Sequence, residues 1–513
     1  MHAHTRSPNR TDVLVAALVA LGVLFVYLAT IQDQLWGDGP HLLRLLDWEQ
    51  RPWWRAWPHW LHTPLAECFG ASGPFRLPHD NYVLASAVPA AVGCGAVFTA
   101  ARLVGAGRAA AVAAALLVGL APVLWLFATV LEVHATHFGV VAVAIAASLW
   151  AAPRTGPRAF LAVHAGLFLV VAASHLTALT LVPIWALLGW FARWRGAADR
   201  EPVRAATLVR ACLPHGLLAC LGFAAAMGVA QLVFYRFATD DAEAVSNIAE
   251  MIADSVEPIS WAYLRDDWVE PLAWLLPPLL FALAGLLVPS SRARLTSDAR
   301  GWWLVTFLGG APLFVFYALW ALPNDGGYAA GWLPFAGVAA ALVPGLFGSA
   351  VAARVVAFAA LVLVGLQALA GWSEVHANAE RFEAFDGPQR VAAFRSALGE
   401  GGGLVLEVDM LNRPLGWDID GVETIDLVLE LRGLSDEAMR ARVIELLETR
   451  VRRHVGPVLV DTRYRDLVGA GGPFEDLIAM FESEVLERFD FVRRPGHGWP
   501  LVELVPRAAD PDE

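Results

Sequence analysis

Repeated long apolar runs constrain this chain more than any other feature. A helix needs about 20 apolar residues to cross the hydrocarbon core of a bilayer. Eleven stretches meet that requirement, near residues 13–31, 81–101, 109–129, 135–151, 159–174, 176–192, 214–235, 271–289, 302–322, 329–349 and 352–371. The 513 residues are 57% hydrophobic and have a mean hydropathy of +0.53, which is too apolar for an ordinary soluble enzyme. We therefore expect a mainly α, polytopic membrane bundle of about eleven spans.

Two apolar stretches are about twice as long as one span requires. Residues 109–151 contain one charged side chain, Glu132, and residues 159–192 are interrupted by Ser-His-Leu at 174–176. We interpret each stretch as two spans joined by a very short turn. This interpretation places Glu132 and His175 near the tips of two hairpins.

The distribution of arginine predicts which side each loop faces. With a cytoplasmic amino terminus, the inner segments hold fifteen arginines and the longer outer segments hold six. An excess of basic residues marks cytoplasmic loops. An odd number of spans then puts the carboxyl-terminal region outside. Because the chain has no lysine and much Ala, Gly and Arg, we expect a GC-rich bacterium, with the protein in its inner membrane.

Charge and cysteine content exclude two further classes. The net charge of −12 argues against nucleic acid as a partner. The four cysteines have no metal-ligand spacing, and at least three lie in or beside spans, so we expect neither a cysteine metal site nor a disulfide framework.

The composition changes to that of a soluble domain at about residue 380. Residues 403–409 and 456–463 have the pattern of buried strands, residues 435–455 that of an amphipathic helix opened by a serine cap, and residues 489–506 that of a closing hairpin. We therefore predict a membrane domain over residues 1–379 and a periplasmic α/β domain over residues 380–513.

Unusual polar residues gather on the predicted outer side. They are Asp38 and Glu67 in the first outer loop, Glu132, His134 and His137 at the second, His175 at the third, Asp240 and Asp241 in the fourth, and Asn324 and Asp325 in the fifth. Ionisable groups at membrane depth are costly and are functional candidates by default. Their convergence from separate loops favours a binding or catalytic site.

The first outer loop begins with an acid between two glycines. Gly37 and Gly39 allow a sharp backbone turn at Asp38. The segment that follows, residues 42–60, mixes leucine, tryptophan and arginine, which is typical of a helix in the membrane interface. An acid fixed there suits chemistry on a lipid-linked substrate. The structural alternative is that Asp38 only caps this helix.

Four motifs carry a resemblance to a known class of enzymes. They are Trp-Gly-Asp-Gly at 36–39 with Trp-Pro-His-Trp-Leu-His-Thr-Pro-Leu at 57–65, the apolar segment 122–150 around Glu-Val-His, Ser-His-Leu-Thr at 174–177, and Leu-Pro-Asn-Asp-Gly-Gly-Tyr at 322–328. In order and predicted side they resemble the GT-C class of membrane glycosyltransferases, in particular a bacterial branch related to protein O-mannosyltransferases. The resemblance covers residues 13–340. The chain departs from the branch at Gly39, His134 and the Pro-His-Trp-Leu-His segment, which leaves the acceptor open.

The resemblance implies a hexosyltransferase-like, inverting transfer from a polyprenyl-phosphate-linked sugar to a protein, lipid or glycan. Asp38 would be the catalytic base or an acid that orients the acceptor, and Glu132, His134, His175 and Asp325 would bind the substrates. Glu132 could instead position Asp38 or a metal, and His175 could help to orient the acid of the first loop. Arg44 would hold the leaving phosphate, although Arg51, Arg55, Arg236 and Arg265 qualify equally. Each role has a structural alternative, such as a helix cap, an exposed hairpin tip or a simple turn.

Two points stay open at this stage. A divalent cation, Mg²⁺ or Mn²⁺, would suit the chemistry, but His134 and His137 supply two ligands at most and no metal site is assigned. Two other functions compete with the glycosyltransferase, namely a transporter or flippase of a lipid-linked saccharide, and a non-catalytic scaffold. A transporter would have matching halves and discontinuous helices with polar residues near mid-bilayer, and the sequence shows neither. The gathering of acids in outer loops argues against a scaffold.

Overall fold

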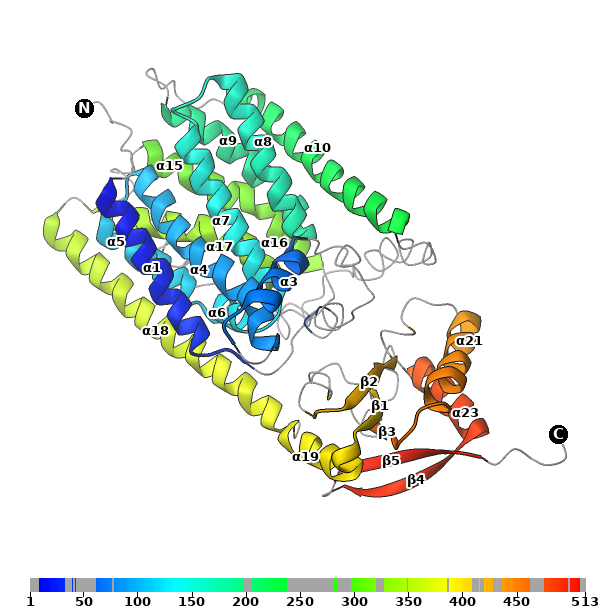
Figure 1. Ribbon diagram of the computed structural model, residues 1–513. Helices are drawn as coiled ribbons and strands as arrows, with labels where there is room; N and C mark the ends of the chain where they lie inside the picture. Colours follow the sequence, from blue (N-terminus) through cyan, green and yellow to red (C-terminus); the bar gives the residue numbers. More distant parts are fainter. Residues whose placement is uncertain are drawn as a thin grey trace. The chain divides into compact units, whose positions relative to one another are not determined.

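The computed structural model describes residues 9–32, 39, 42, 61–75, 78–196, 205–237, 281, 283, 297–319, 327–347, 349–384, 387–407, 415, 419–427, 431, 436–461, 475–496 and 499–507. The chain forms two compact units (Figure 1). The first comprises residues 1–32, 45–238 and 252–377, and the second comprises residues 33–44, 239–251 and 378–513.

The first unit is helical throughout its described part. Its elements are α1 (Arg10–Leu28), α3 (His62–Ser72), α4 (Pro78–Val104), α5 (Arg108–Gly119), α6 (Pro122–Thr129), α7 (Val133–Ala151), α8 (Pro157–Ser174), the 3₁₀ turn η2 (Leu176–Leu181), α9 (Val182–Gly196), α10 (Ala205–Phe237), α15 (Ser297–Trp303), the π-helical turn η3 (Leu304–Leu308), α16 (Gly309–Leu319), the 3₁₀ turns η4 (Gly327–Trp332) and η5 (Val343–Leu346) on either side of α17 (Leu333–Leu342), and α18 (Ala350–Ala384).

The predicted spans correspond to these helices. In the described ranges, nine helices are long and apolar enough to cross a membrane, or ten if α5 and α6 form one span bent by 61°. With that bent pair, ten of the eleven predicted spans have a counterpart. The remaining one, near residues 271–289, lies outside the described residues except for Phe281 and Leu283. The chain is a multi-pass membrane protein, as predicted.

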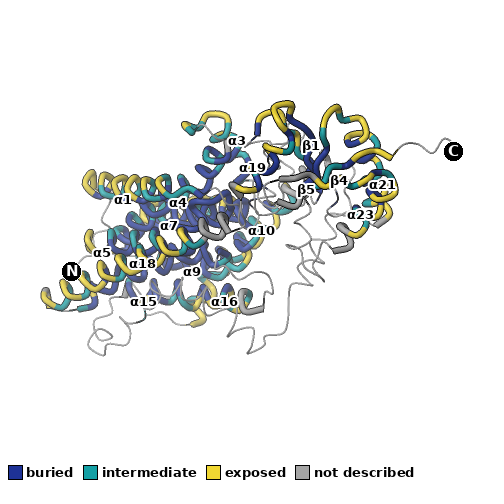
Figure 2. The backbone as a smooth tube through the Cα atoms, turned by 90° about the horizontal axis from the view of Figure 1, so that it is seen from below, coloured by how far each residue is buried: buried dark blue, intermediate teal, exposed yellow. Residues whose placement is uncertain are grey.

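Burial separates the outer helices of the bundle from its centre (Figure 2). Outer helices expose large apolar side chains, including Phe25 of α1, Leu221 of α10 and Leu369 of α18. Every residue of α17 is buried. A helix that is apolar and buried on all sides belongs at the centre of a bundle, whereas exposed apolar stripes of this size suit a lipid environment.

Helices α4 and α7 cross at very close range. A Cβ atom added to Gly139 would lie 2.1 Å from the carbonyl oxygen of Pro89. Glycine permits this approach, as small residues do at helix contacts in membranes. Pro89 has no N–H, so it leaves the Ala85 carbonyl, one turn earlier, without its helical donor. The Thr136 hydroxyl of α7 donates to that carbonyl at 2.6 Å.

Both predicted hairpin tips are confirmed. Helix α6 ends at Thr129, and α7 begins after Glu132, which has an extended backbone at the N-cap position. Helix α8 ends at Ser174, and His175 is extended before the η2 turn. The bend between α5 and α6 was not predicted, because residues 109–129 read as one continuous apolar span.

Arginine contacts collect at one end of the bundle. Asp12 at the start of α1 accepts from Arg102 at 3.2 Å and from Arg108 at 2.7 Å, which ties α1 to the α4–α5 connection. Arg193 near the end of α9 donates to the carbonyls that follow α7, and Arg195 pairs with Asp298 of α15 at 3.5 Å. The hairpin tips lie at the other ends of these same helices. Which end faces the cytoplasm stays a prediction.

The second unit contains a five-stranded sheet. Its strands are β1 (Gly403–Glu407), β2 (Val422–Asp426), β3 (Val458–Asp461), β4 (Phe489–Gly496) and β5 (Trp499–Pro506), in the order β2-β1-β3-β5-β4. Strand β1 pairs in parallel with β2 and β3, and β5 pairs antiparallel with β3 and β4. The two predicted strands and the closing hairpin are confirmed.

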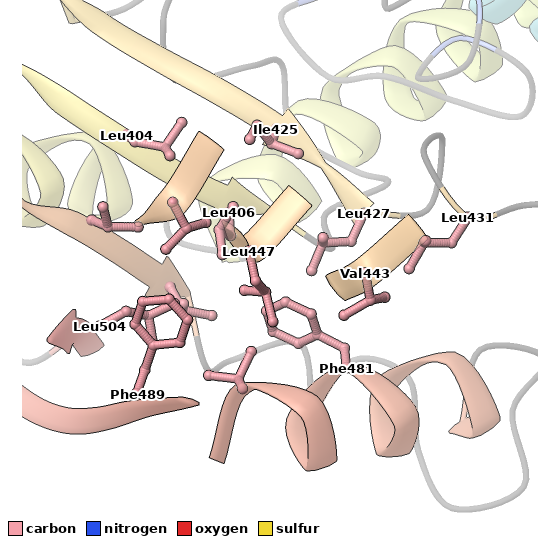
Figure 3. Close-up of a cluster of buried hydrophobic side chains, with 14 residues drawn as sticks. Leu404, Leu406, Ile425, Leu427, Leu431, Val443, Leu447, Phe481, Phe489 and Leu504 are labelled. Carbon is pink, nitrogen blue, oxygen red and sulfur yellow. The ribbon is translucent and has the colours of Figure 1, made fainter. Parts of the chain in front are cut away.

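Helices cover both faces of this sheet. Leu404 and Leu406 of β1 pack with Phe481 of α23 (Glu475–Arg488) and with α21 (Asp436–Leu446), which continues into the π-helical turn η8 (Leu447–Val451) (Figure 3). Val405, which points to the opposite face, packs with Phe394 of α19 (Gly387–Leu398). This alternation of successive side chains is that of a strand buried on both faces.

The glycine run before β1 has a steric role. Gly402 follows the 3₁₀ turn η6 (Gly399–Gly401) and has a φ of +67°. A Cβ atom there would lie 2.1 Å from the carbonyl oxygen of Gly421. Only glycine combines this backbone conformation with such an approach. The run therefore lets β1 and β2 start side by side.

Candidate functional site

Three of the predicted site residues lie together where two hairpin tips meet. The rings of His134 and His175 have centroids 4.9 Å apart, and the Nε2 atom of His134 lies 3.8 Å from a Glu132 carboxylate oxygen. All three side chains are buried. The structure therefore brings together residues from the second and third outer segments, as the convergence argument predicted.

Glu132 is buried, not exposed at a tip. Its side chain is 2% exposed, and its Oε1 atom accepts from the backbone N–H of Val133 at 3.0 Å. The hydroxyl of Ser86 in α4 donates to the Glu132 carbonyl at 2.8 Å, and the Glu132 N–H donates to the Ser86 hydroxyl oxygen at 3.2 Å. The start of a helix favours negative charge. The fold thus holds an acid in a fixed orientation away from solvent, and the exposed-tip alternative is wrong.

His175 has a defined hydrogen-bonding state. Its Nδ1 atom accepts from the backbone N–H of Thr177 at 3.1 Å. A backbone N–H can only donate, so Nδ1 carries a lone pair and the neutral ring has its hydrogen on Nε2. His175 is therefore an N–H donor through Nε2.

His137 has the opposite state and a packing role. Ser174 donates its hydroxyl to the Val171 carbonyl at 2.7 Å, so its oxygen receives the Nδ1–H of His137, also at 2.7 Å. The Nε2 atom of His137 faces the backbone of Gly331, where an added Cβ atom would lie 2.6 Å away. Its ring lies 5.3 Å from that of His175. His137 therefore packs beside His175.

The η4 turn closes over these histidines. An added Cβ atom on Gly327 would lie 2.4 Å from the His134 ring. The Tyr328 ring stands edge-on to His134, with centroids 5.1 Å apart, and lies 6.0 Å from that of His175. Gly327 and Tyr328 come two and three residues after Asp325 in the sequence, so the fourth motif also reaches this site.

His62 is a site residue that sequence reasoning missed. It is the first residue of α3, it is fully buried, and its Nδ1 atom lies 2.8 Å from the Thr136 hydroxyl of α7. Thr136 is one turn after Glu132. The motif at 57–65 contains both His59 and His62, and nothing in its pattern distinguishes them. Burial also raises the pKa of Glu67 in the same helix.

The remaining predicted site residues cannot be placed. Asp38, Arg44 and Asp325 lie outside the described residues, as do the alternative arginines Arg51, Arg55 and Arg265. The chain enters the first outer loop beside the site, however. The backbone N–H of Gln32 donates to the Thr129 carbonyl at 2.9 Å, three residues before Glu132.

The described residues do not form a metal site by themselves. Across those residues, no three side chains of His, Cys, Asp or Glu are placed to hold a metal ion. Because Nε2 of His137 abuts Gly331, the spacing of His134 and His137 does not translate into a shared ligand position.

Comparison with solved structures defines the fold. The chain aligns with the crystal structure of ArnT from Cupriavidus metallidurans bound to undecaprenyl phosphate, over 97% of this chain and 98% of ArnT, at 16% identity and a TM-score of 0.55. This is the GT-C fold of ArnT. The apo state of ArnT aligns over 96% of this chain and 97% of its own length, at 14% identity and a TM-score of 0.53. The predicted GT-C architecture, with its carboxyl-terminal α/β domain, is confirmed.

The other comparisons do not assign the chain to a family. An oligosaccharyltransferase of Archaeoglobus fulgidus, in complex with zinc and sulfate, aligns over 71% of this chain and 53% of its own, at 14% identity and a TM-score of 0.41. No family model matches the chain, and no curated protein is significantly similar to it. The O-mannosyltransferase-like branch within the GT-C fold stays a prediction.

Proposed function

We propose that this protein is a membrane glycosyltransferase that moves a sugar from a polyprenyl-phosphate donor to a hydroxyl group of an acceptor. The observation that carries the proposal is the cluster of the buried residues Glu132, His134 and His175 with the half-buried Tyr328, assembled from three separate segments. A GT-C fold similar to that of ArnT, which has been crystallised with undecaprenyl phosphate, supports a polyprenyl-phosphate donor here.

Such a transfer needs a base for the acceptor hydroxyl and donors for the leaving phosphate. We assign the base to Asp38. The acceptor O–H bond breaks toward Asp38, the acceptor oxygen forms the new bond to the anomeric carbon, and the bond from that carbon to the phosphate breaks. The polyprenyl phosphate leaves with the electron pair. Inversion at the anomeric carbon is part of the proposal and derives from the family resemblance.

The described residues divide the binding roles. His175 offers an N–H donor at Nε2, which suits a phosphate oxygen. Glu132 offers a fixed carboxylate, which suits sugar hydroxyls or the orientation of His134. We assign the leaving phosphate to an arginine of the outer loops, with Arg44 as the candidate, because a guanidinium binds phosphate oxygens bidentately. Asp325 is assigned to the sugar on the basis of the sequence resemblance. The proposed setting is a bacterial inner membrane, with the site and the α/β domain on the periplasmic side.

Mass spectrometry of glycoconjugates tests this function. A deletion strain of the source bacterium is complemented with wild type, Asp38→Asn or Asp47→Asn at matched expression. Asp47 is a second acid of the same loop and serves as the control. Periplasmic proteins and extracted lipids are then compared for a sugar that depends on the gene.

We expect wild type and Asp47→Asn to restore one glycoconjugate, and Asp38→Asn to fail. The restored product identifies the sugar and the acceptor class. Full restoration by Asp38→Asn would remove this residue from the chemistry. A wild type that changes no glycoconjugate would refute the glycosyltransferase.

One observation favours the transporter alternative. The pair α5–α6 is bent by 61° inside the apolar region, and discontinuous helices are common in transporters. The residues at this break, Leu120, Ala121 and Pro122, are apolar, whereas a transporter would place ion or substrate ligands there. Accumulation of a lipid-linked saccharide on one side of the membrane, without a lost glycoconjugate, would support this alternative.

A further inference from the structure

Arg193, near the end of α9, is held in place by neutral groups. Its NH1 group donates to the carbonyl oxygens of Ala152 and Thr155, at 3.0 and 2.9 Å, in the connection between α7 and α8. Its guanidinium carbon lies 5.9 Å from the centre of the Phe160 ring in α8. The side chain is half-buried. Because carbonyls and a phenyl ring carry no net charge, these contacts fix the guanidinium without balancing its charge.

Three other arginines at this end of the bundle each contact an acid of the chain. They are Arg102 and Arg108 with Asp12, and Arg195 with Asp298.

The elements around Arg193 offer no such acid. Residues 133–196 and 205–237, which form α7 to α10, contain neither aspartate nor glutamate. From α10, the ring of His215 contacts that of Phe160, with centroids 5.7 Å apart, and it too supplies no negative charge. A cation that is partly removed from water is unfavourable unless an anion compensates it. The matching anion for Arg193 therefore comes from outside the chain.

The remaining edge of this guanidinium has the geometry of a phosphate ligand. The two N–H bonds of NH1 serve the two carbonyl oxygens, and these are the hydrogen bonds of Arg193 in the described part of the chain. Nε–H and NH2 remain, and they form one edge of the planar group. Two parallel N–H donors on such an edge bind two oxygens of a phosphate bidentately.

Tryptophan side chains place this end of the bundle at the depth of lipid headgroups. Trp194 stacks on Trp190, with centroids 5.4 Å apart. Trp150, near the end of α7, is 50% exposed, and the Arg154 guanidinium lies over its ring at 4.5 Å. Tryptophan gathers at the interface between membrane and water, with its ring at headgroup level. The anion that meets Arg193 at this depth is therefore a lipid headgroup.

The start of α8 adds to the attraction for an anion. Gly156 is its N-cap residue and provides no side-chain cap, and Arg158 in the first turn is exposed. The first N–H groups of a helix favour negative charge. Thr155, whose carbonyl oxygen holds Arg193, directly precedes Gly156. The guanidinium and the start of α8 thus adjoin.

We propose that Arg193 binds the phosphate of an anionic phospholipid, with Arg158 and the start of α8 adding to the attraction. With the predicted orientation, this lipid belongs to the cytoplasmic leaflet. The site lies at the other end of the helices from Glu132 and His175, and lipid binding there is independent of glycosyl transfer.

Thermal unfolding of the purified full-length protein in detergent tests this binding. Wild type, Arg193→Gln and Arg354→Gln are each measured without lipid, with phosphatidylglycerol, and with phosphatidylcholine, which has a phosphate but no net charge. Arg354→Gln removes an exposed arginine near the start of α18 and is the matched control. We expect phosphatidylglycerol to raise the Tm of wild type and of Arg354→Gln more than phosphatidylcholine does, and Arg193→Gln to lose this difference. Each shift is taken from the same variant without lipid, so a lower starting Tm does not affect it.

Titration with phosphatidylglycerol under native mass spectrometry measures the affinity of the first bound lipid. Arg193→Gln should bind about tenfold more weakly, as for the loss of charge-assisted hydrogen bonds. Arg193→Lys keeps the charge but not the planar edge, and should fall between wild type and Arg193→Gln. Arg158→Gln changes an exposed side chain and should weaken binding about fivefold, as for one basic residue near a membrane surface.

Several results would overturn the lipid site. Equal Tm shifts with phosphatidylglycerol and phosphatidylcholine would exclude an anionic headgroup. An unchanged shift in a folded Arg193→Gln protein would exclude Arg193, and an equal loss in Arg354→Gln would reduce the effect to overall charge. Inorganic phosphate that raises the Tm as much as phosphatidylglycerol would make the ligand a free anion. If Arg193→Gln does not fold, wild-type affinity in both Arg193→Lys and Arg158→Gln would be decisive against the site.

Discussion

Gly139→Ala tests the close crossing of α4 and α7 on which the site depends. The new methyl carbon would lie 2.1 Å from the carbonyl oxygen and 2.4 Å from the carbonyl carbon of Pro89. Carbon and oxygen atoms normally approach to no less than about 3.3 Å, so the two helices must part by about 1 Å. The colliding atoms belong to a helix backbone and cannot rotate away.

The magnitude follows from two opposing effects. Overpacking of a tight interior costs about 3 kcal/mol when nothing can yield. Alanine gains about 1 kcal/mol over glycine in helix propensity. Gly139→Ala should therefore lose about 2 kcal/mol in free energy of unfolding. Gly166→Ala is the matched control, because Gly166 lies inside α8 with nothing within 4 Å of an added Cβ atom. It should gain about 1 kcal/mol.

Thermal unfolding of the purified proteins in one detergent measures the order. We expect the Tm values to rank Gly139→Ala below wild type and Gly166→Ala at or above it. A shift of about 1 Å would also stretch the 2.8 Å bond from Ser86 to Glu132 beyond hydrogen-bonding distance, so product formation should fall with it. Equal Tm values for the two variants would refute the steric argument.

Three further predictions concern charged contacts. Glu407→Ala should destabilise the second unit by about 3–5 kcal/mol, because it leaves the buried Arg390 guanidinium without the carboxylate that lies 2.9 Å away, and Arg390→Met combined with Glu407→Leu should recover most of the loss in Tm. Burial raises the pKa of Glu484, but hydrogen bonds from Arg440 and Arg488 outweigh it and leave the pKa below 4.5. Its contribution to stability should be complete above about pH 4.5 and vanish as the pH falls through the lowered pKa, and Glu484→Gln should flatten that part of the profile of Tm against pH. Asp12→Ala removes the carboxylate shared by Arg102 and Arg108, and should cost about 2 kcal/mol in chemical unfolding, whereas no loss would mean that this end of α1 is held by packing alone.

Hydropathy and the polar residues that interrupt the apolar runs predicted the bundle well, because both are local properties of the sequence. The apolar runs fix the spans, and the polar interruptions at Glu132 and His175 fix the two tips. The strands of the second unit were predicted equally well, because their apolar runs end in turn residues. The GT-C fold followed from the order of the motifs.

The contacts within the site could not be predicted in the same way. The Glu132 backbone is held by Ser86 of another helix, and His62 contacts Thr136, whose hydroxyl donates to the Ala85 carbonyl in place of the N–H that Pro89 lacks. These are long-range contacts between helices that each carry an ordinary sequence. Tyr328 was quoted within its motif but not singled out, because its neighbour Asp325 carried the charge.

The bend between α5 and α6 did leave a local signal. A residue before proline avoids the helical conformation, and Ala121 precedes Pro122 with an extended ψ of 135°. The run 109–129 was nevertheless interpreted as one span because its hydropathy is continuous. Hydropathy indicates whether a segment lies in lipid or in water, but it does not indicate whether the helix is straight.

The same bend makes the assembly of the bundle depend on chain order. At the break, the Gly119 carbonyl accepts the phenolic hydroxyl of Tyr27 at 2.6 Å, inside the apolar region. A backbone carbonyl without a hydrogen-bond donor in hydrocarbon costs several kcal/mol. The α5–α6 pair is therefore not stable in lipid without Tyr27. Tyr27 belongs to α1, which leaves the ribosome before α5 and α6. When the broken span enters the membrane, the side chain that completes it is already there.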